Sequence, residues 1–376
     1  MVLACQVPVF RYALERWEAD VYEIVVFHRG GLSNDRQALV KQLEEASEAK
    51  LGAGKSFANL IVGVVDLATA TPETLEKAGP RPEGLQLPAL VVRYPSSLNV
   101  PYPVWSGELT EGAVSALIDS PARQEITRRL IGGDSVVWVL IESGDAAEDG
   151  DAFETLQTNL SALEKKLKLP GLEDITSDPE YQPDVPIELA LRFSAIRIAR
   201  SDPAETLFVA MLMGIEADLK EYAQKPIAVP VFGRGRALYG LTGKGINGDT
   251  IETASRALIG PCSCTIKELN PGVDLLMAVD WNGVLKGEAV PTKPLPELPA
   301  FPSAEDSVDV TEVGVDVEAQ VDVGQQNVVA PSRAEVPLPG GMVLPITIVV
   351  LVGLGIVTVG SLWLRQQSRK VERAGK

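Results

Sequence analysis

Histidine and cysteine are scarce in this chain, which has one histidine and three cysteines among 376 residues. One histidine excludes a metal centre with several histidine ligands, and three cysteines exclude a scaffold held together by many disulfides. Two neighbouring thiols are also too few ligands for a structural zinc site. The sequence therefore predicts no bound metal and no cofactor, and a single histidine without supporting spacing gives no Ser-His-Asp triad.

Positive charge is also in short supply, because 34 Lys and Arg against 51 Asp and Glu give a formal net charge of −17. An acidic surface repels phosphates, so the composition argues against a nucleic acid partner. Gly54-Lys55-Ser56 matches the end of a phosphate-binding loop, but Ala49 stands where that motif needs its first glycine. We therefore expect no nucleotide site.

One long apolar run is present, from Met342 to Leu364, and it contains no charged residue. About 20 helical residues cross the hydrocarbon core of a bilayer, so we predict a transmembrane helix over residues 342–364. The tail, residues 365–376, is basic, and basic flanks of a span stay in the cytoplasm. The sequence thus predicts a single-pass protein of the cell membrane whose large N-terminal part lies outside the cytoplasm.

Such a topology needs an export signal, and residues 1–19 lack the basic start and the apolar run of an ordinary one. We interpret them as an N-terminal segment carrying a truncated signal or a lipoprotein cleavage box, with Cys5 as the lipidated residue. A tail-anchored topology without an N-terminal signal is the alternative. Residues 286–341 are rich in proline first and then in Val, Asp and Glu, which predicts a disordered linker, or stalk.

Residues 20–132 alternate compact apolar runs with amphipathic stretches. The apolar runs predict buried strands, and Ser33 or Asn34 and then Thr71-Pro72 mark helix starts. The predicted order is strand, helix, strand, helix, strand, strand and helix. We expect strands at residues 22–28, 59–67, 89–94 and 104–108, and helices at residues 35–50, from residue 72 and at residues 110–130.

Residues 133–285 repeat much of this order. We expect strands at residues 135–141, 188–199, 207–215, 229–241 and 273–281, and helices at residues 152–169 and 249–259. The matched order predicts an α/β fold with two tandem units, each a mixed sheet with helices on both faces.

Leu87-Pro88 precedes the third expected strand, and this position together with the element order resembles a thioredoxin-like domain. The resemblance implies that the Leu87–Pro88 peptide bond is cis. That family carries Cys-x-x-Cys after its first strand, but here residues 28–33 contain no thiol, and residues 142–145 in the second unit contain none either. The resemblance therefore implies two degenerate units with binding or scaffolding roles instead of the shared redox activity.

The densest glycine cluster of the chain surrounds Arg234, Arg236 and Lys244. Arginines and a lysine among open backbone amides are typical of an anion nest, which predicts a ligand or partner contact at these three residues. A β-hairpin or bulged edge with turn glycines is the alternative interpretation.

Cys262 and Cys264 form the one paired-thiol motif of the sequence. They are compatible with a strained bridge to each other, with a bridge from one of them to Cys5, or with buried free thiols. His28 ends the first expected strand, and we interpret it as a polar strand-end residue near Asp66. A titrating group near neutral pH is the alternative.

The function expected from these features is non-enzymatic, namely a membrane-anchored module for protein recognition or scaffolding. Residues 230–246 and 260–264 also resemble segments of uncharacterised bacterial single-pass membrane proteins associated with transporter permeases. This resemblance implies a protein partner in a transporter-type membrane complex. The alternatives are a thiol-disulfide oxidoreductase that uses Cys262 and Cys264, and a receptor for an anionic ligand that uses Arg234 and Arg236.

Overall fold

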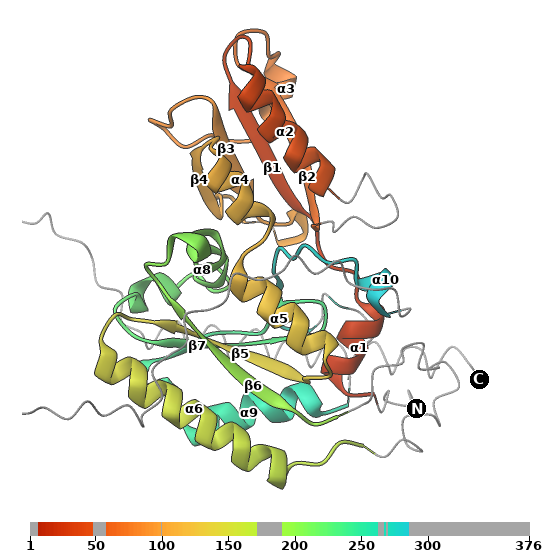
Figure 1. Cartoon of the computed structure of the whole chain (residues 1–376), viewed down its shortest axis with the longest axis vertical. Helices are drawn as coiled ribbons and strands as arrows, with labels where there is room; N and C mark the ends of the chain where they lie inside the picture. Colours follow the sequence, from red (N-terminus) through yellow and green to blue (C-terminus); the bar gives the residue numbers. More distant parts are fainter. Residues whose placement is uncertain are drawn as a thin grey trace, which may run out of the picture. The chain divides into compact units, whose positions relative to one another are not determined.

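A computed structural model describes residues 7–47, 58–98, 100–170, 190–261, 267 and 270–285 (Figure 1). The chain divides into two compact units, residues 1–300 and 301–376, and all of the described residues belong to the first. The predicted stalk, transmembrane helix and basic tail lie outside the described residues. Across the described part of the chain, no helix is both long and apolar enough to cross a bilayer.

The first sheet has four strands in the order β2-β1-β3-β4. β1 and β2 are parallel, whereas β3 is antiparallel to both β1 and β4. The central strands are almost fully buried because their side chains are apolar on both faces. The strands are β1 (Tyr22–His28), β2 (Leu60–Asp66), β3 (Ala89–Arg93) and β4 (Trp105–Glu108).

Helices cover both faces of the first sheet. α2 (Asn34–Ala46) and α4 (Glu111–Ile118) pack on one face, and the short α3 (Pro72–Ala78) packs on the other. Each begins where the sequence supplies an N-cap, since the side chains of Ser33, Thr71 and Thr110 accept hydrogen bonds from backbone amides of the first turn. The 3-10 helix η2 (Ser96–Leu98) follows β3.

The second sheet follows the same order. β6 pairs in parallel with β5, β5 is antiparallel to β7, and β7 to β8. β10 extends this sheet beyond β8, and β9 pairs with β7. The strands are β5 (Val136–Glu142), β6 (Phe193–Ala199), β7 (Ile227–Phe232), β8 (Arg236–Ala237), β9 (Leu241–Thr242) and β10 (Val273–Asp274).

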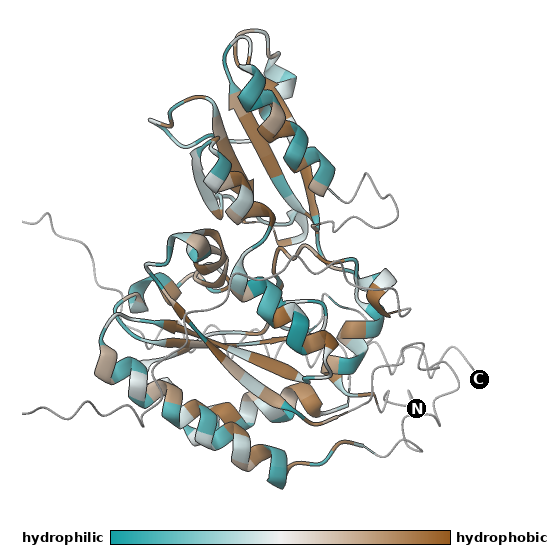
Figure 2. Cartoon of the chain, in the orientation of Figure 1, coloured by the Kyte–Doolittle hydropathy of each residue, from teal (hydrophilic) through white to brown (hydrophobic). Residues whose placement is uncertain are grey.

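Helices also cover both faces of the second sheet, with hydrophilic residues outward (Figure 2). One face carries α1 (Val9–Arg16), α6 (Ala146–Lys166) and α9 (Gly248–Ile259), and the other carries α5 (Pro121–Ile131) and α8 (Thr206–Leu212). The other helices in the described ranges are η3 (Pro203–Glu205), η4 (Leu219–Tyr222), η5 (Gly243–Gly245) and α10 (Trp281–Leu285).

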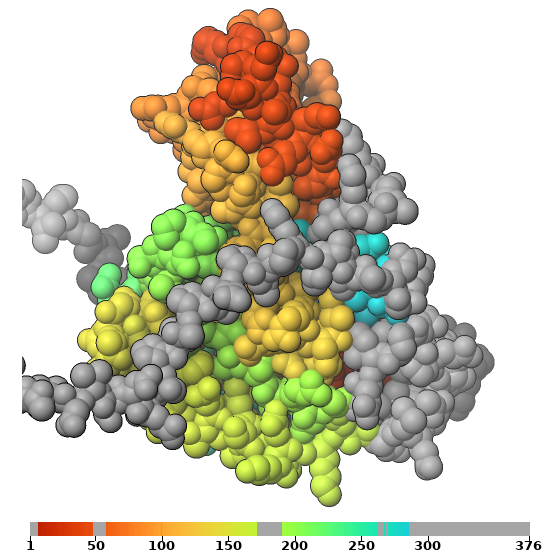
Figure 3. Space-filling model, viewed as in Figure 1, coloured from red at the N-terminus to blue at the C-terminus, as the bar shows by residue number. Residues whose placement is uncertain are grey.

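A single hydrophobic cluster joins the two sheets. It runs from the α2–α4 face of the first sheet to the α5–α8 face of the second, and it includes Leu275, Leu276 and Met277 after β10. In the space-filling view, α2 and α4 lie on the viewer's side of the first sheet, and α5 lies on that side of the second (Figure 3). The two sheets are therefore parts of one packed unit.

Four predicted elements differ from the structure. The strand expected at residues 229–241 is β7 followed by the short strands β8 and β9, which fold back on it. The helix expected at residues 110–130 is two helices, α4 and α5, because Ser120 is extended and caps α5 while Pro121 opens it. The strand expected at residues 207–215 is helix α8, whose side chains are apolar almost all round. Such a buried helix has no periodicity that separates it from a buried strand. The strand expected at residues 273–281 is confined to β10, and a helix begins at Trp281.

Two helices also pack on the second sheet although the sequence analysis placed them elsewhere. α1 falls within residues 1–19, which we interpreted as a signal or lipobox, and it packs against α9 and β7. α5 falls within the first predicted unit, yet it contacts β5 and β6 of the second sheet. The second sheet therefore recruits segments from before and after the first sheet.

Candidate functional site

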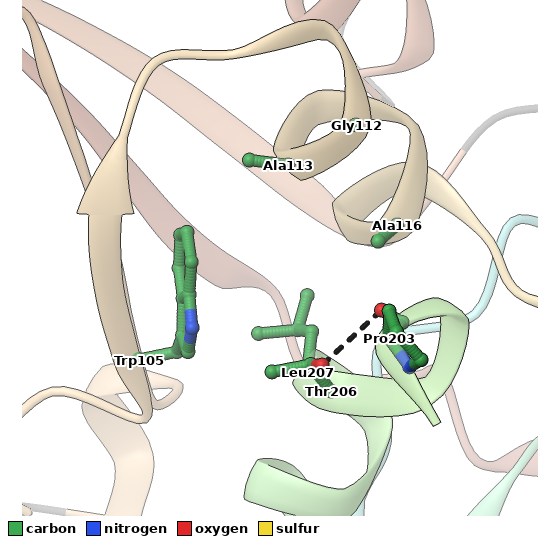
Figure 4. A pocket seen from close by; sticks show the side chains of 7 residues that line it. All are labelled: Trp105, Gly112, Ala113, Ala116, Pro203, Thr206 and Leu207. Carbon is green, nitrogen blue, oxygen red and sulfur yellow. Dashed lines mark hydrogen bonds between the residues drawn. The ribbon is translucent and has the colours of Figure 1, made fainter. Parts of the chain in front are cut away.

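An apolar pocket of about 170 Å³ opens between β4, the first turns of α4 and the start of α8 (Figure 4). Trp105 forms one wall, and Pro203 and Leu207 lie across from the α4 residues. Because β4 is the edge strand of the first sheet and α8 covers the second, the pocket forms where the two halves of the unit meet.

Small residues create the space. Gly112, Ala113 and Ala116 present almost no side chain to the pocket from α4. Trp105 is placed by its pairing with Val92 of β3, and its ring lies over Gly107. A Cβ atom on Gly107 would lie 2.5 Å from the ring, so a glycine is needed for the indole to take this position.

The chemistry of the pocket is that of an apolar binding site. Thr206 is its one hydroxyl, and it donates a hydrogen bond to the Pro203 carbonyl at 3.1 Å (Figure 4). None of its lining residues is titratable. The volume is below the roughly 300–1,000 Å³ of sites for drug-sized ligands. The pocket therefore suits one apolar side chain and offers no acid or base for catalysis.

A buried polar network lies beside this pocket, next to Thr206 in the chain. Glu205 accepts hydrogen bonds from the Ser120 hydroxyl at 2.6 Å and the Ala122 amide at 2.8 Å. Burial raises the pKa of Glu205, while these bonds and Arg123 oppose the rise. Ser120 is itself buried, so its hydroxyl does not face a substrate. The network holds α5 against η3.

Arg123 completes this network and is fully buried. Its guanidinium donates to the Leu117 carbonyl at 3.2 Å, to the Leu276 carbonyl at 3.0 Å and to the Ala116 carbonyl. The carbonyls of residues 116 and 117 belong to the last turn of α4, where a helix leaves carbonyls without partners. Arg123 therefore caps α4 and fixes the break between α4 and α5.

The two predicted contact arginines are buried and bonded within the chain. Arg234 donates to the Leu14 carbonyl at 2.8 Å and the Glu15 carbonyl at 3.2 Å, and it pairs with Glu18 at 3.0 Å. Burial lowers the pKa of Arg234. These contacts give Arg234 the role of a cap on the last turn of α1.

Arg236 is similarly enclosed. It pairs with Asp274 at 2.8 Å and donates to the Asn270 carbonyl at 2.9 Å. Gly233 and Gly235, on either side of Arg234, have positive φ and form the turn between β7 and β8. This geometry is the β-hairpin with turn glycines that we gave as the alternative. Lys244 is exposed in η5.

Arg236 belongs to a buried charge cluster that the sequence did not reveal. Lys267 pairs with Asp20 at 2.8 Å and with Asp274, and the Asp20 amide donates to Asp274 at 2.8 Å. The Tyr22 hydroxyl donates to the Asp274 carbonyl at 2.7 Å, and burial raises the pKa of Tyr22. Every charged group of this charge cluster pairs with a group of opposite charge. The role of the charge cluster is therefore to join β10 to the start of β1.

The end of the first sheet, where the resemblance places a redox centre, holds a different set of contacts. His28 Nδ1 donates to the Gly30 carbonyl at 2.7 Å, and the Gly30 amide donates to Asp66 at 2.9 Å. Hydrogen bonds from the Ala68 and Gly30 amides lower the pKa of Asp66. His28 and Asp66 thus meet through the loop backbone, with each bonded to Gly30.

Pro88 lies at the same end of the sheet as His28, because the β1–β3 ladder ends at the pair Phe27–Ala89. The Leu87–Pro88 peptide bond is cis. In the second sheet Pro226 takes the corresponding place before β7, and among the described residues only Leu87–Pro88 is cis.

The cysteine candidates Cys5, Cys262 and Cys264 lie outside the described residues. Within the described ranges, no three His, Cys, Asp or Glu side chains are grouped so that they could hold a metal ion. No known protein family model matches this chain, and no curated protein matches it.

The pocket was missed at the sequence level for a particular reason. The sequence around Trp105 carries no motif that marks a pocket, and the small residues of α4 stand at the spacing of one helix face. Its other wall, Pro203 to Leu207, was assigned in part to a strand. A strand gives no reason to bring this segment against α4.

Proposed function

We propose that this chain is a membrane-anchored, extracytoplasmic protein-recognition module whose head contains two degenerate thioredoxin-like units. The shared strand order of the two sheets supports the assignment of both units, and the cis bond before β3 supports that of the first. The loop after β1, residues 28–33, contains no cysteine, so the proposal gives no thiol chemistry to it. The apolar run at residues 342–364 is the proposed anchor.

The Trp105 pocket carries this proposal. It is open and apolar and has no titratable side chain in its lining, which fits it to hold an apolar side chain of a protein partner. Large aromatic residues in small pockets are the usual anchors of protein interfaces. The partner we propose is a protein component of a transporter-type membrane complex.

Site-specific photo-crosslinking in native membranes tests the proposal. A photoreactive phenylalanine analogue replaces Thr206 at the pocket in the full chain, and the control carries it at Thr253, another exposed helical threonine, on α9. We expect a discrete protein adduct from position 206 and none from position 253.

A second variant ties that adduct to the pocket. Ala116→Phe fills the space between α4 and Leu207, and it should lower the yield of the adduct by about tenfold or more. An adduct that is equally strong with the pocket filled, or no adduct from position 206, would overturn the proposed function.

A further inference from the structure

The outer edge of β2 differs from the rest of the first sheet. Within the described residues β2 pairs only with β1, so one side of the strand has no neighbour. Two hydrogen bonds at its ends show which residues of β2 point their backbone groups toward β1. One runs from the Tyr22 amide to the Asn59 carbonyl, and the other from the Leu67 amide to the His28 carbonyl. The odd-numbered residues of β2 therefore bond to β1, and the even-numbered ones direct their amides and carbonyls outward.

The described residues satisfy the backbone groups of this edge at both ends of β2 but not in the middle. The Ser47 hydroxyl donates to the Leu60 carbonyl at 3.0 Å. The Asp66 carbonyl accepts from the Thr69 and Ala70 amides of the following turn. Among the described residues, none bonds to the outward backbone groups of Val62 and Val64. The free groups are thus centred on Gly63.

The side chains of this edge are also unusual. Ile61 and Val64 are 46% and 42% exposed, and the strand has no charged side chain before Asp66. Edge strands are normally protected from pairing by charged side chains, by proline or by a covering segment, because an uncovered apolar edge can pair with another strand. The corresponding edge strand of the second sheet, β6, follows that rule, since its Arg197 pairs with Glu142.

We propose that two copies of this chain pair through β2, antiparallel and about a two-fold axis at Gly63. This register places Val62 of each copy opposite Val64 of the other, so that each free amide meets a free carbonyl and four hydrogen bonds form. Asp66 then faces Leu60 of the second copy, and no like charges are brought opposite each other. In an isologous contact both copies use the same surface patch. The outward amides and carbonyls of Val62 and Val64 form such a patch, because they are arranged symmetrically about Gly63.

Gly63 gives the sharpest test, because it lies on the proposed axis. A Cβ atom there meets nothing within 4 Å, so a cysteine fits. Residue 63 of one copy would face residue 63 of the other as a non-hydrogen-bonded pair. The Cα atoms of such a pair are about 4.5 Å apart, which is within the range of a disulfide. Residues 64 of the two copies would be about 8 Å apart, beyond that range.

The experiment uses the full chain in membranes, with the three native cysteines changed to serine, and with copper phenanthroline as the oxidant. We expect Gly63→Cys to give a disulfide-linked dimer, with at least about tenfold more dimer than Val64→Cys. Equal yields from the two positions, or no dimer from Gly63→Cys, would overturn the proposal.

A non-covalent measurement tests the hydrogen bonds. Val64→Pro removes an amide that has no partner among the described residues. Because each copy loses this donor, two of the four intermolecular bonds are lost. By sedimentation of the full chain in detergent, its dimer dissociation constant should rise by about 10- to 30-fold. Val64→Lys should act in the same direction if the proline variant folds poorly. Tyr222→Lys, at a side chain that is also 42% exposed, should leave the dimer unchanged.

This pairing does not depend on the pocket at Trp105. Ala116→Phe should leave the Gly63→Cys dimer intact, and Val64→Lys should leave folding of the pocket intact. If Val64→Pro, Val64→Lys and Tyr222→Lys all dimerise like the natural chain, the edge of β2 is not the contact.

Discussion

Glu205 shows at the residue scale how the unit uses a buried carboxyl group. It ends η3 and packs against the first turn of α5, where the Ala122 amide and the Ser120 hydroxyl donate to it. Burial nevertheless raises its pKa above the ordinary value of 4.5. The folded protein therefore holds a proton on Glu205 more readily than the unfolded chain does, and the ionised form costs stability.

The pH dependence follows from that direction. The stability that comes from a raised pKa is fully present at a pH below the pKa of the unfolded state. It is lost as the pH rises through the pKa of the folded state. Glu205→Gln cannot ionise, so its free energy of unfolding relative to the natural chain should increase as pH rises above about 4.5. Urea unfolding, followed by tryptophan fluorescence from pH 4 to pH 7, measures this difference. A difference that falls with pH would contradict the raised pKa.

Glu205→Ala separates the charge from the hydrogen bonds. It leaves the Ser120 hydroxyl and the Ala122 amide without their acceptor, which should cost about 2–3 kcal/mol at pH 4, and this cost should shrink as pH rises and Glu205 of the natural chain ionises. Glu205→Gln keeps a side-chain acceptor and should lose less stability than Glu205→Ala. Comparing the two variants shows how much of the stability depends on the bonds.

Buried arginines were the hardest residues to interpret from the sequence. Arg234 and Arg236 stand among glycines, a pattern typical of an anion site, yet their partners are Leu14 and Asn270, which are distant in the chain. A guanidinium group carries five donors, so a buried one needs several acceptors. No local pattern shows where those acceptors come from.

At the scale of single elements, α1 depends on contacts from the β7–β8 turn. Arg234 bonds to two carbonyls of its last turn, and a Cβ atom on Gly233 would lie 2.6 Å from Ala13. The glycine therefore permits the close approach of the turn to α1, and the arginine satisfies carbonyls that the helix leaves open.

This arrangement separates Arg234 from Lys244, which the sequence placed in the same contact surface. Arg234→Met removes the bonds to Leu14, Glu15 and Glu18, and it should cost about 2–3 kcal/mol and speed amide exchange in α1. Lys244→Met changes an exposed side chain and should stay within about 0.5 kcal/mol. Urea unfolding and hydrogen exchange of both variants check this. If the two variants lose the same amount of stability, Arg234 and Lys244 have the same structural role.

The elements themselves were predictable where a local signal marks both ends. Ser33, Thr71 and Asn247 are N-caps in the structure, and the helices they begin are the predicted ones. α8 was predicted wrongly because only burial by its neighbours separates it from a strand. The break at Pro121 had a signal in the sequence, but the apolar spacing on both sides of it favoured one helix.

At the scale of the whole unit, order along the chain and packing in space differ. The repeated element order predicted two mixed sheets, and the structure contains two. Which sheet α1 and α5 join could not be predicted, because that depends on the apolar faces of strands far away in the sequence. The pocket at Trp105 has the same origin, since its two walls come from helices that cover different sheets.

The charge cluster around Asp274 is the clearest polar link between the sheets. Asp274 lies in β10 of the second sheet and holds Arg236, Lys267 and the amide of Asp20, just before β1 of the first. Removing its carboxylate leaves the buried Arg236 without its ion-pair partner, and it leaves Lys267 with Asp20 as its acid. Since the hydrophobic cluster is continuous across both sheets, the natural unit should open as a whole, with equal protection in β1 and β5.

Asp274→Ala should break that equality. We expect a loss of about 3–5 kcal/mol in stability. Hydrogen exchange should become faster in β1 than in β5, because the link to the start of β1 is lost while the β5–β7 ladder keeps its partners. Asp151→Ala, at an exposed acid of α6, is the control and should leave both strands unchanged. If β1 and β5 lose protection equally, the charge cluster stabilises the unit as a whole, and the hydrophobic cluster alone couples the sheets.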